Sequence, residues 1–184
     1  MLVLASQSPR RSEILRQAGI SFITRPANVD ETVLADESPY GYVQRVAQEK
    51  AVAIKAAPDD IVLGADTVVV IDGHILGKPC DPAGALRMLE TLSGREHAVL
   101  TGICFRRATE TILDVAKTRV WFLPLRREEL DEYVATGEPM DKAGAYAIQG
   151  LASKFIQRID GSYTNVVGLP IELVYQYLRH WGHL

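Results

Sequence analysis

Apolar residues along this chain alternate between short β-branched runs and stripes at helical spacing. The first run, at 2–4, is followed by Ser8-Pro9, where serine fits the N-cap and proline the first helical position. Apolar residues then recur at helical spacing until Gly19, which predicts the end of the helix. The opening of the chain therefore predicts a strand, a tight connection and an amphipathic helix.

The same alternation continues to the end of the chain and predicts a layered α/β or α+β fold. Trp121 and Trp181 fall within apolar patterns, which assigns both side chains to the core. The remaining predicted strands are 21–24, 61–71, 74–76 after the turn signal Asp72-Gly73, 98–106, 111–123, and a pair at 155–159 and 162–167. The remaining predicted helices follow Ser38-Pro39 and Asp81-Pro82, cover about 127–136, and close the chain after Gly168-Leu169-Pro170.

Length and composition narrow the class of protein. A chain of 184 residues with 47% hydrophobic and 23% charged residues suits one globular domain, residues 1–184, or a two-lobed unit. The net charge of −3 argues against a general nucleic-acid binder. Cys80 and Cys104 are too few for a disulfide framework or a zinc cluster, so we expect reduced thiols packed like small apolar residues. The absence of a signal-peptide pattern and of an apolar run long enough to span a bilayer predicts a cytoplasmic protein without a membrane partner.

The first helix start is a candidate anion site. Arg10 and Arg11 fall in the first turn, where the helix dipole disfavours cations, and Ser6 and Ser8 add hydroxyl groups. A polyphosphate would relieve that repulsion and would bind the free amide groups. The alternative is a solvated helix start with two surface arginines.

Asp66 is the candidate catalytic carboxylate. Counted by two along a regular strand, it shares a face with apolar residues and with Gly64, where a missing side chain would leave space. A carboxylate in such a run is costly unless it is paired, binds a metal or faces a cleft. A purely structural ion pair satisfies the same pattern.

Four further residues are candidates with an ordinary alternative each. Lys50 borders the apolar stripe of its helix and would otherwise extend to solvent, and Lys78, before Pro79, would otherwise be a loop lysine. Glu31 lies in a polar loop, where an acidic residue is mostly solvated surface, and Asp30 beside it is an equally acidic neighbour that leaves the choice between them open. Gln149 offers the paired donor and acceptor that suit a pyrimidine edge, in a segment that could also be a glycine-rich turn.

Four motifs in register resemble the Maf family of nucleoside triphosphate pyrophosphatases. The resemblance runs from Leu2 to about Leu173, and no single motif carries it alone. The motifs are Ser6-Gln7-Ser8-Pro9-Arg10-Arg11, Gly64-Ala65-Asp66-Thr67, Leu76-Gly77-Lys78-Pro79 and Asp141 to Gly150. The resemblance implies a mixed twisted sheet with flanking helices, forming two lobes around a central cleft as in inosine triphosphate pyrophosphatases.

The resemblance also implies an activity and a set of roles. The reaction would be hydrolysis of dTTP or UTP, and of modified pyrimidine nucleotides, to a monophosphate and pyrophosphate, because Ala145 to Gly150 matches that branch of the family. Asp66 would activate water, and Glu31 would help to hold a divalent cation, Mg²⁺ or Mn²⁺, arriving with the nucleotide. The implied substrate-binding residues are Ser6, Ser8, Arg10, Arg11, Lys50, Thr67, Lys78 and Gln149, with Arg10, Thr67 and Gln149 acting in base specificity.

Two further expectations come from the resemblance alone. One is a homodimer. The other is the rival function: a nucleotide-binding regulator of septum formation with little turnover.

Overall fold

The computed structural model describes residues 1–184 and confirms the mixed α/β class. Seven strands form one sheet in the order β2-β1-β3-β5-β6-β7, with β4 paired to β3. The strands are β1 (Leu2–Leu4), β2 (Ile23–Thr24), β3 (Ile61–Ile71), β4 (His74–Leu76), β5 (Glu96–Arg107), β6 (Glu110–Phe122) and β7 (Ile156–Asp160). The helices are α1 (Pro9–Gln17), α2 (Pro39–Ala53), α3 (Pro82–Leu92), α4 (Arg127–Ala135), α5 (Tyr163–Val167) and α6 (Ile171–His180).

The sheet is mixed because it contains both parallel and antiparallel strand pairs. Strand β1 pairs in parallel with β2 and with β3, whereas β4 and β7 run antiparallel to β3 and β6. Three short 3-10 helices, η1 (Glu138–Asp141), η2 (Ala143–Ala145) and η3 (Leu151–Phe155), follow α4. None of the helices combines the length and the apolarity that crossing a membrane requires.

The chain folds into two compact units. The first comprises residues 1–67, 101–116 and 168–184, and the second comprises 68–100 and 117–167. Strands β3, β5 and β6 each contribute residues to both units.

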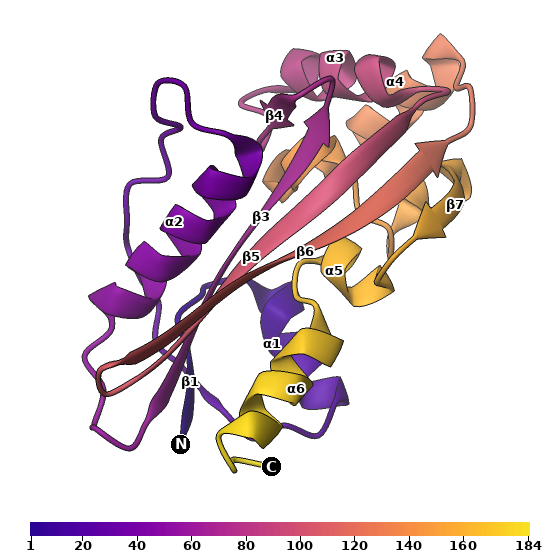
Figure 1. The fold of residues 1–184 in the computed structure, drawn as a ribbon. Helices are drawn as coiled ribbons and strands as arrows, with labels where there is room; N and C mark the ends of the chain where they lie inside the picture. The colour runs from indigo at the N-terminus through magenta and orange to yellow at the C-terminus, as the bar shows by residue number, and fades with distance from the viewer. The chain divides into compact units, whose positions relative to one another are not determined.

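Helix α2 packs unusually close to the strands of the first unit, because two glycines face it. A Cβ at Gly64 of β3 would lie 2.1 Å from the carbonyl oxygen of Ala47, and one at Gly102 of β5 would lie 2.2 Å from that of Val43. The expectation that Gly64 leaves open space beside Asp66 is therefore wrong. The helix backbone occupies that space, and Figure 1 shows α2 lying along one side of β3.

Helix α1 begins where the sequence predicts, but its first turn is organised differently. Ser8 has the extended backbone of an N-cap, φ −66° and ψ 115°, yet its side chain makes no capping hydrogen bond. Instead, the amide of Ser8 donates to Oγ of Ser6 over 3.1 Å. Ser6 therefore shapes the connection between β1 and α1. In Figure 1, α1 and α6 lie on the side of β3 opposite α2.

The segment 162–167 corrects one sequence prediction. It was expected to form a strand paired with 155–159, but it forms helix α5, and β7 pairs with β6 instead. The Oγ of Ser162 accepts from the amide of Asn165, which starts a helical turn. The buried Asn165 amide group donates to the carbonyl of Val99 and to Oγ1 of Thr118. These side-chain bonds replace the strand pairing that the apolar pattern suggested.

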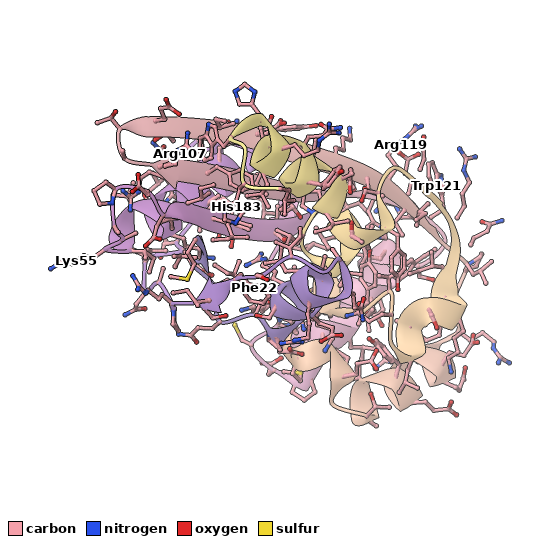
Figure 2. All side chains as sticks on the ribbon, turned by 90° about the horizontal axis from the view of Figure 1, so that it is seen from below. Phe22, Lys55, Arg107, Arg119, Trp121 and His183 are labelled. Carbon is pink, nitrogen blue, oxygen red and sulfur yellow. The ribbon has the colours of Figure 1, made fainter.

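Trp121 was expected in the core and is half-buried at the surface of the second unit. Its neighbours Val120 and Phe122 are buried, so strand alternation directs the indole to the opposite face. The guanidinium groups of Arg119 and Arg158 lie 5.2 and 4.6 Å from its ring centroid, and Figure 2 shows Arg119 beside it.

Two other residues that were expected in the core, Trp181 and Cys80, also lie outside it. Trp181 follows the end of α6 and is half-buried, with the guanidinium of Arg107 5.2 Å from its ring centroid. Cys80 is exposed, whereas Cys104 is buried as predicted, and both are free thiols.

The core of the second unit contains a buried histidine among aromatic rings. His97 packs edge-to-face on Phe122 and on Tyr146, and its Nε2 lies 2.8 Å from the hydroxyl of Tyr146. Its Nδ1 is buried without a hydrogen-bond partner. Burial lowers the pKa of His97 to about 4, so the ring is neutral at physiological pH.

We predict that Gly64→Ala destabilises the protein by about 1–3 kcal/mol, because the new methyl group must displace the backbone of α2. Denaturant unfolding followed by far-UV circular dichroism measures the loss. Gly77→Ala is the matched control, since no atom lies within 4 Å of the position its Cβ would take. Equal stability of the two variants would contradict the close packing.

We also predict that His97 makes stability depend on pH. The unfolded chain takes up the proton near pH 6.5 and the folded chain only near 4, so stability falls as the pH drops through this window. His97→Gln should flatten the slope by at most about 1.4 kcal/mol per pH unit. The exposed His180, changed to Asn, provides the control. Unchanged slopes in urea unfolding across the pH series would refute a neutral His97.

Candidate functional site

Arg11 belongs to the first turn of α1, and its side chain is buried in the first unit. Its Nε donates to the carbonyl of Gly168 over 2.8 Å, and its terminal nitrogens donate to Oγ of Ser6 and Oγ1 of Thr67, each over 3.1 Å. The planar guanidinium thus joins the segment after β1, strand β3 and the segment before α6. The structure brings three predicted site residues, Ser6, Arg11 and Thr67, into direct contact.

A second group of predicted residues meets on the α2 side of β3. The Lys50 ammonium lies 2.7 Å from Oδ1 of Asp66 and 2.7 Å from Oε1 of Glu31. Lys50 and Asp66 are both buried, whereas the Glu31 side chain is half-exposed. The tendency of a helix-border lysine to extend to solvent is overridden here, because the close approach of α2 at Gly64 places Lys50 beside a buried carboxylate.

Successive residues of β3 connect the two groups. Side chains alternate across a strand, so Asp66 faces α2 while Thr67 faces α1 and Arg11. Burial lowers the pKa of Arg11, and the negative charges of Asp66 and Glu31 oppose that shift. The carboxylates therefore act electrostatically on Arg11 although neither is its hydrogen-bond partner in the contacts above.

Two other predicted residues lie at the start of α1. Ser8 and Arg10 are both half-buried, next to the connection that Ser6 shapes. Lys78 and Gln149 belong to the second unit, where both are exposed.

The segment that carries Gln149 is held at both of its ends within the second unit. At the start, the amide of Gly144 donates to the carbonyl of Gly77, the residue before Lys78, over 3.0 Å. At the end, the carboxylate of Glu138 accepts from the amide of Leu151 over 3.1 Å. Between these points residues 144–148 are buried, so Gln149 is an exposed side chain on a fixed backbone.

A Cβ would fit at neither glycine of this segment. At Gly144, with φ +67°, it would lie 2.7 Å from the side chain of Val69, and at Gly150 it would lie 2.4 Å from that of Glu138. The predicted close approach of the backbone in this glycine-rich stretch is therefore present.

Sequence reasoning missed three groups of this site. The hydroxyl of Thr101 lies 2.9 Å from Oγ1 of Thr67, and the Gly168 carbonyl holds Arg11. The hydroxyl of Tyr42 donates to the carbonyl of Glu31 over 2.9 Å. Thr101 gives no sequence signal, but Tyr42 lies two turns before Lys50 on the same helix face and could have been found from that spacing.

The carboxylates of Glu31 and Asp66 can take a small cation. Both approach one position, which the Lys50 ammonium occupies at 2.7 Å from each. Hard oxygen ligands from one or two carboxylates suit Mg²⁺ that keeps waters and substrate oxygens as its other ligands. No cluster of three or more His, Cys, Asp or Glu forms a complete metal cage. The arrangement therefore combines two carboxylates with the buried cations Lys50 and Arg11 in the first unit.

Comparisons with known proteins show what the chain is similar to. A dTTP/UTP pyrophosphatase of Koribacter versatilis is 50% identical over 184 residues, covering 100% of this chain and 95% of its own. One from Anaeromyxobacter dehalogenans is 54% identical over 185 residues, covering 98% and 94%.

Among solved structures, the Ham1 protein of Staphylococcus aureus matches with a TM-score of 0.56 at 14% identity, covering 97% of this chain and 98% of its own. That likeness concerns the fold alone. The model of the family described as Maf-like protein matches residues 1–181, and the chain therefore belongs to the Maf family.

Proposed function

We propose that this chain is a nucleoside triphosphate pyrophosphatase that hydrolyses dTTP and UTP to the monophosphate and pyrophosphate. The observation that carries the proposal is the buried Asp66 carboxylate, held by Lys50 and lying in the field of Arg11. The relatives that are 50% and 54% identical over nearly the whole chain bear the name of this activity. We extend the proposal to modified pyrimidine nucleotides.

Asp66 is the proposed proton acceptor for the attacking water. Lys50 donates to its Oδ1 over 2.7 Å, which leaves Oδ2 as the oxygen that would accept from the water. The water then attacks the α phosphorus, the bond from that phosphorus to the bridging oxygen breaks, and pyrophosphate leaves. The proton of the water passes to Asp66.

The cations supply the electrostatic part of catalysis. Arg10, Arg11, Lys50 and Lys78 neutralise the phosphates and the leaving pyrophosphate, while the hydroxyls of Ser6 and Ser8 bind phosphate oxygens. For Arg11 the support is its charge, because its hydrogen bonds go to protein groups. Arg11 thus also orients Ser6 and Thr67.

Glu31 and Asp66 are the proposed protein ligands of a divalent cation, Mg²⁺ or Mn²⁺, that arrives with the nucleotide. The support is their shared approach to a single cation position. When bound, such a cation neutralises phosphate charge and orients the phosphate oxygens. Glu31 and Asp66 would hold this cation, and Lys50, which contacts both carboxylates, would share them with it.

Gln149, Thr67 and Arg10 are the proposed base-reading residues. An amide group can pair with the donor and acceptor of a uracil or thymine edge, and Gln149 sits on a backbone fixed at both ends. Discrimination then comes from leaving the donor and acceptor of the Gln149 amide unmatched when the wrong base binds.

The remaining proposals concern the protein as a whole. We propose that residues 1–184 act as one Maf-like domain, that two copies form a homodimer, and that the enzyme works in the cytoplasm. No nucleic-acid or membrane partner is part of the proposal, in line with the net charge of −3.

The decisive experiment incubates the protein with Mg²⁺ and, separately, dTTP, UTP, dCTP, GTP and 7-methyl-GTP, and measures pyrophosphate and orthophosphate. Pyrophosphate from dTTP and UTP alone is the expected result. Asp66→Asn should fold and bind nucleotide but turn over at least about a hundredfold more slowly. Asp131→Asn, which removes an exposed carboxylate of α4, should leave the rate unchanged.

Two outcomes would contradict the proposal. Orthophosphate as the only product would mean attack at another phosphorus. Nucleotide binding without turnover on any substrate would favour the regulator of septum formation instead.

Gln149→Ala should change base preference more than phosphate affinity. We expect the ratio of kcat/KM for dTTP over dCTP to fall by about tenfold or more, the scale of a lost polar contact to the base. Steady-state kinetics on both nucleotides measures the ratio, with the exposed Gln157→Ala as control. An equal loss for both nucleotides would remove Gln149 from base reading.

A further inference from the structure

The residue that most directly orders the Glu31 loop is an arginine with no role assigned above. The connection from 30 to 37 contains no helix or strand, yet it carries Glu31 to Lys50. Its tip is exposed, with Val33 and Leu34 at 45% and 55% exposure. Such a segment needs specific contacts to hold a carboxylate in place.

Arg45 of α2 makes those contacts. Its Nε and one terminal nitrogen donate to the two carboxylate oxygens of Glu37 over 2.7 and 2.9 Å. That same terminal nitrogen also donates to the carbonyl of Thr32 over 3.0 Å, and the other terminal nitrogen contacts Glu49. One guanidinium therefore joins the two ends of the 30–37 segment to α2.

Glu37 also binds the backbone in the middle of the 30–37 segment. Its carboxylate also accepts from the amide of Leu34 over 3.1 Å. The side chains of Arg45 and Glu37 are only 22% and 11% exposed, so the pair is better protected than an ordinary surface ion pair. The hydrogen bond to Arg45 lowers the pKa of Glu37, which keeps the pair ionised near neutrality.

Three residues of α2 contact Glu31 or the residue next to it. Arg45 binds the carbonyl of Thr32, the next residue, and Tyr42 binds the carbonyl of Glu31 itself. The ammonium group of Lys50 forms an ion pair with the Glu31 carboxylate. Tyr42, Arg45 and Lys50 all belong to α2, so a single helix fixes the backbone and the side chain of Glu31.

We propose that Arg45, with Glu37, is the positioning clamp that holds Glu31 in the cation site. This proposal rests on the proposed role of Glu31 in binding a divalent cation. Arg45 touches neither Asp66 nor Lys50 in the contacts described, and it acts through the 30–37 backbone. Residues that contact a metal ligand, and not the metal itself, contribute about 10–100-fold to metal affinity by orienting that ligand.

The test measures Mn²⁺ binding by electron paramagnetic resonance, with and without a non-hydrolysable α,β-imido-dUTP. Arg45→Met should weaken Mn²⁺ binding by about tenfold or more, and Glu37→Gln should weaken it to a similar extent. Arg45→Lys should restore little of the Mn²⁺ affinity. A lysine cannot make a two-point contact with the Glu37 carboxylate and also bind the carbonyl of Thr32. Arg127→Met is the matched control, since Arg127 also bridges two carboxylates, Glu90 and Asp131, in the second unit.

A double-mutant cycle separates positioning from general stability. In a Glu31→Gln background, Arg45→Met should cause no further loss of Mn²⁺ affinity, because the clamp acts only through Glu31. A purely structural Arg45 would lower the melting temperature and leave Mn²⁺ affinity unchanged, and that result would overturn the proposal. Additive losses, or no Mn²⁺ binding by the unchanged protein, would overturn it as well.

The outcome is separable from that of the proposed function. If the variants lose Mn²⁺ affinity but the unchanged protein hydrolyses no nucleotide, the clamp stands and the pyrophosphatase proposal fails. If hydrolysis is confirmed and Arg45→Met binds Mn²⁺ normally, the clamp fails alone.

Discussion

The close approach of α2 to the sheet is the constraint on which the candidate site depends. Gly64 and Gly102, on strands β3 and β5, face the helix backbone at distances that no side chain would permit. At this separation Lys50 reaches Asp66 over 2.7 Å. Since the same helix also holds the Glu31 loop through Tyr42 and Arg45, its seating sets the geometry of both carboxylates.

This site combines charges that would each be costly alone. Lys50 and Asp66 are buried, and removing Lys50 would take away the ammonium that pairs with the buried Asp66 carboxylate. Glu31 adds a second carboxylate to the same ammonium and stays half-exposed. An ion pair that is stable yet open on one side is suited to exchange one cation for another, which a fully enclosed pair is not.

Much of this arrangement could be predicted from the sequence, in particular the features that depend on residues close together in the chain. The β3 boundaries, the Asp72-Gly73 turn and the Ser38 and Asp81 caps depend on neighbouring residues, and the structure contains them all. The predictions for 162–167 and for the space at Gly64 were wrong because they depend on distant partners: Asn165 binds Val99 and Thr118, and Gly64 faces α2. The prediction for Trp121 was wrong because the apolar run does not show which face of β6 is buried. Likewise, periodicity could place Lys50 at the border of a helix face but could not pair it with Asp66 and Glu31.

The central claim is that Asp66 activates a water that attacks the α phosphorus. Hydrolysis of dTTP in H₂¹⁸O, with mass spectrometry of both products, tests it most directly. The account predicts that the label enters the monophosphate, because that product keeps the α phosphorus. Label in pyrophosphate would mean attack at the β phosphorus and would contradict the account.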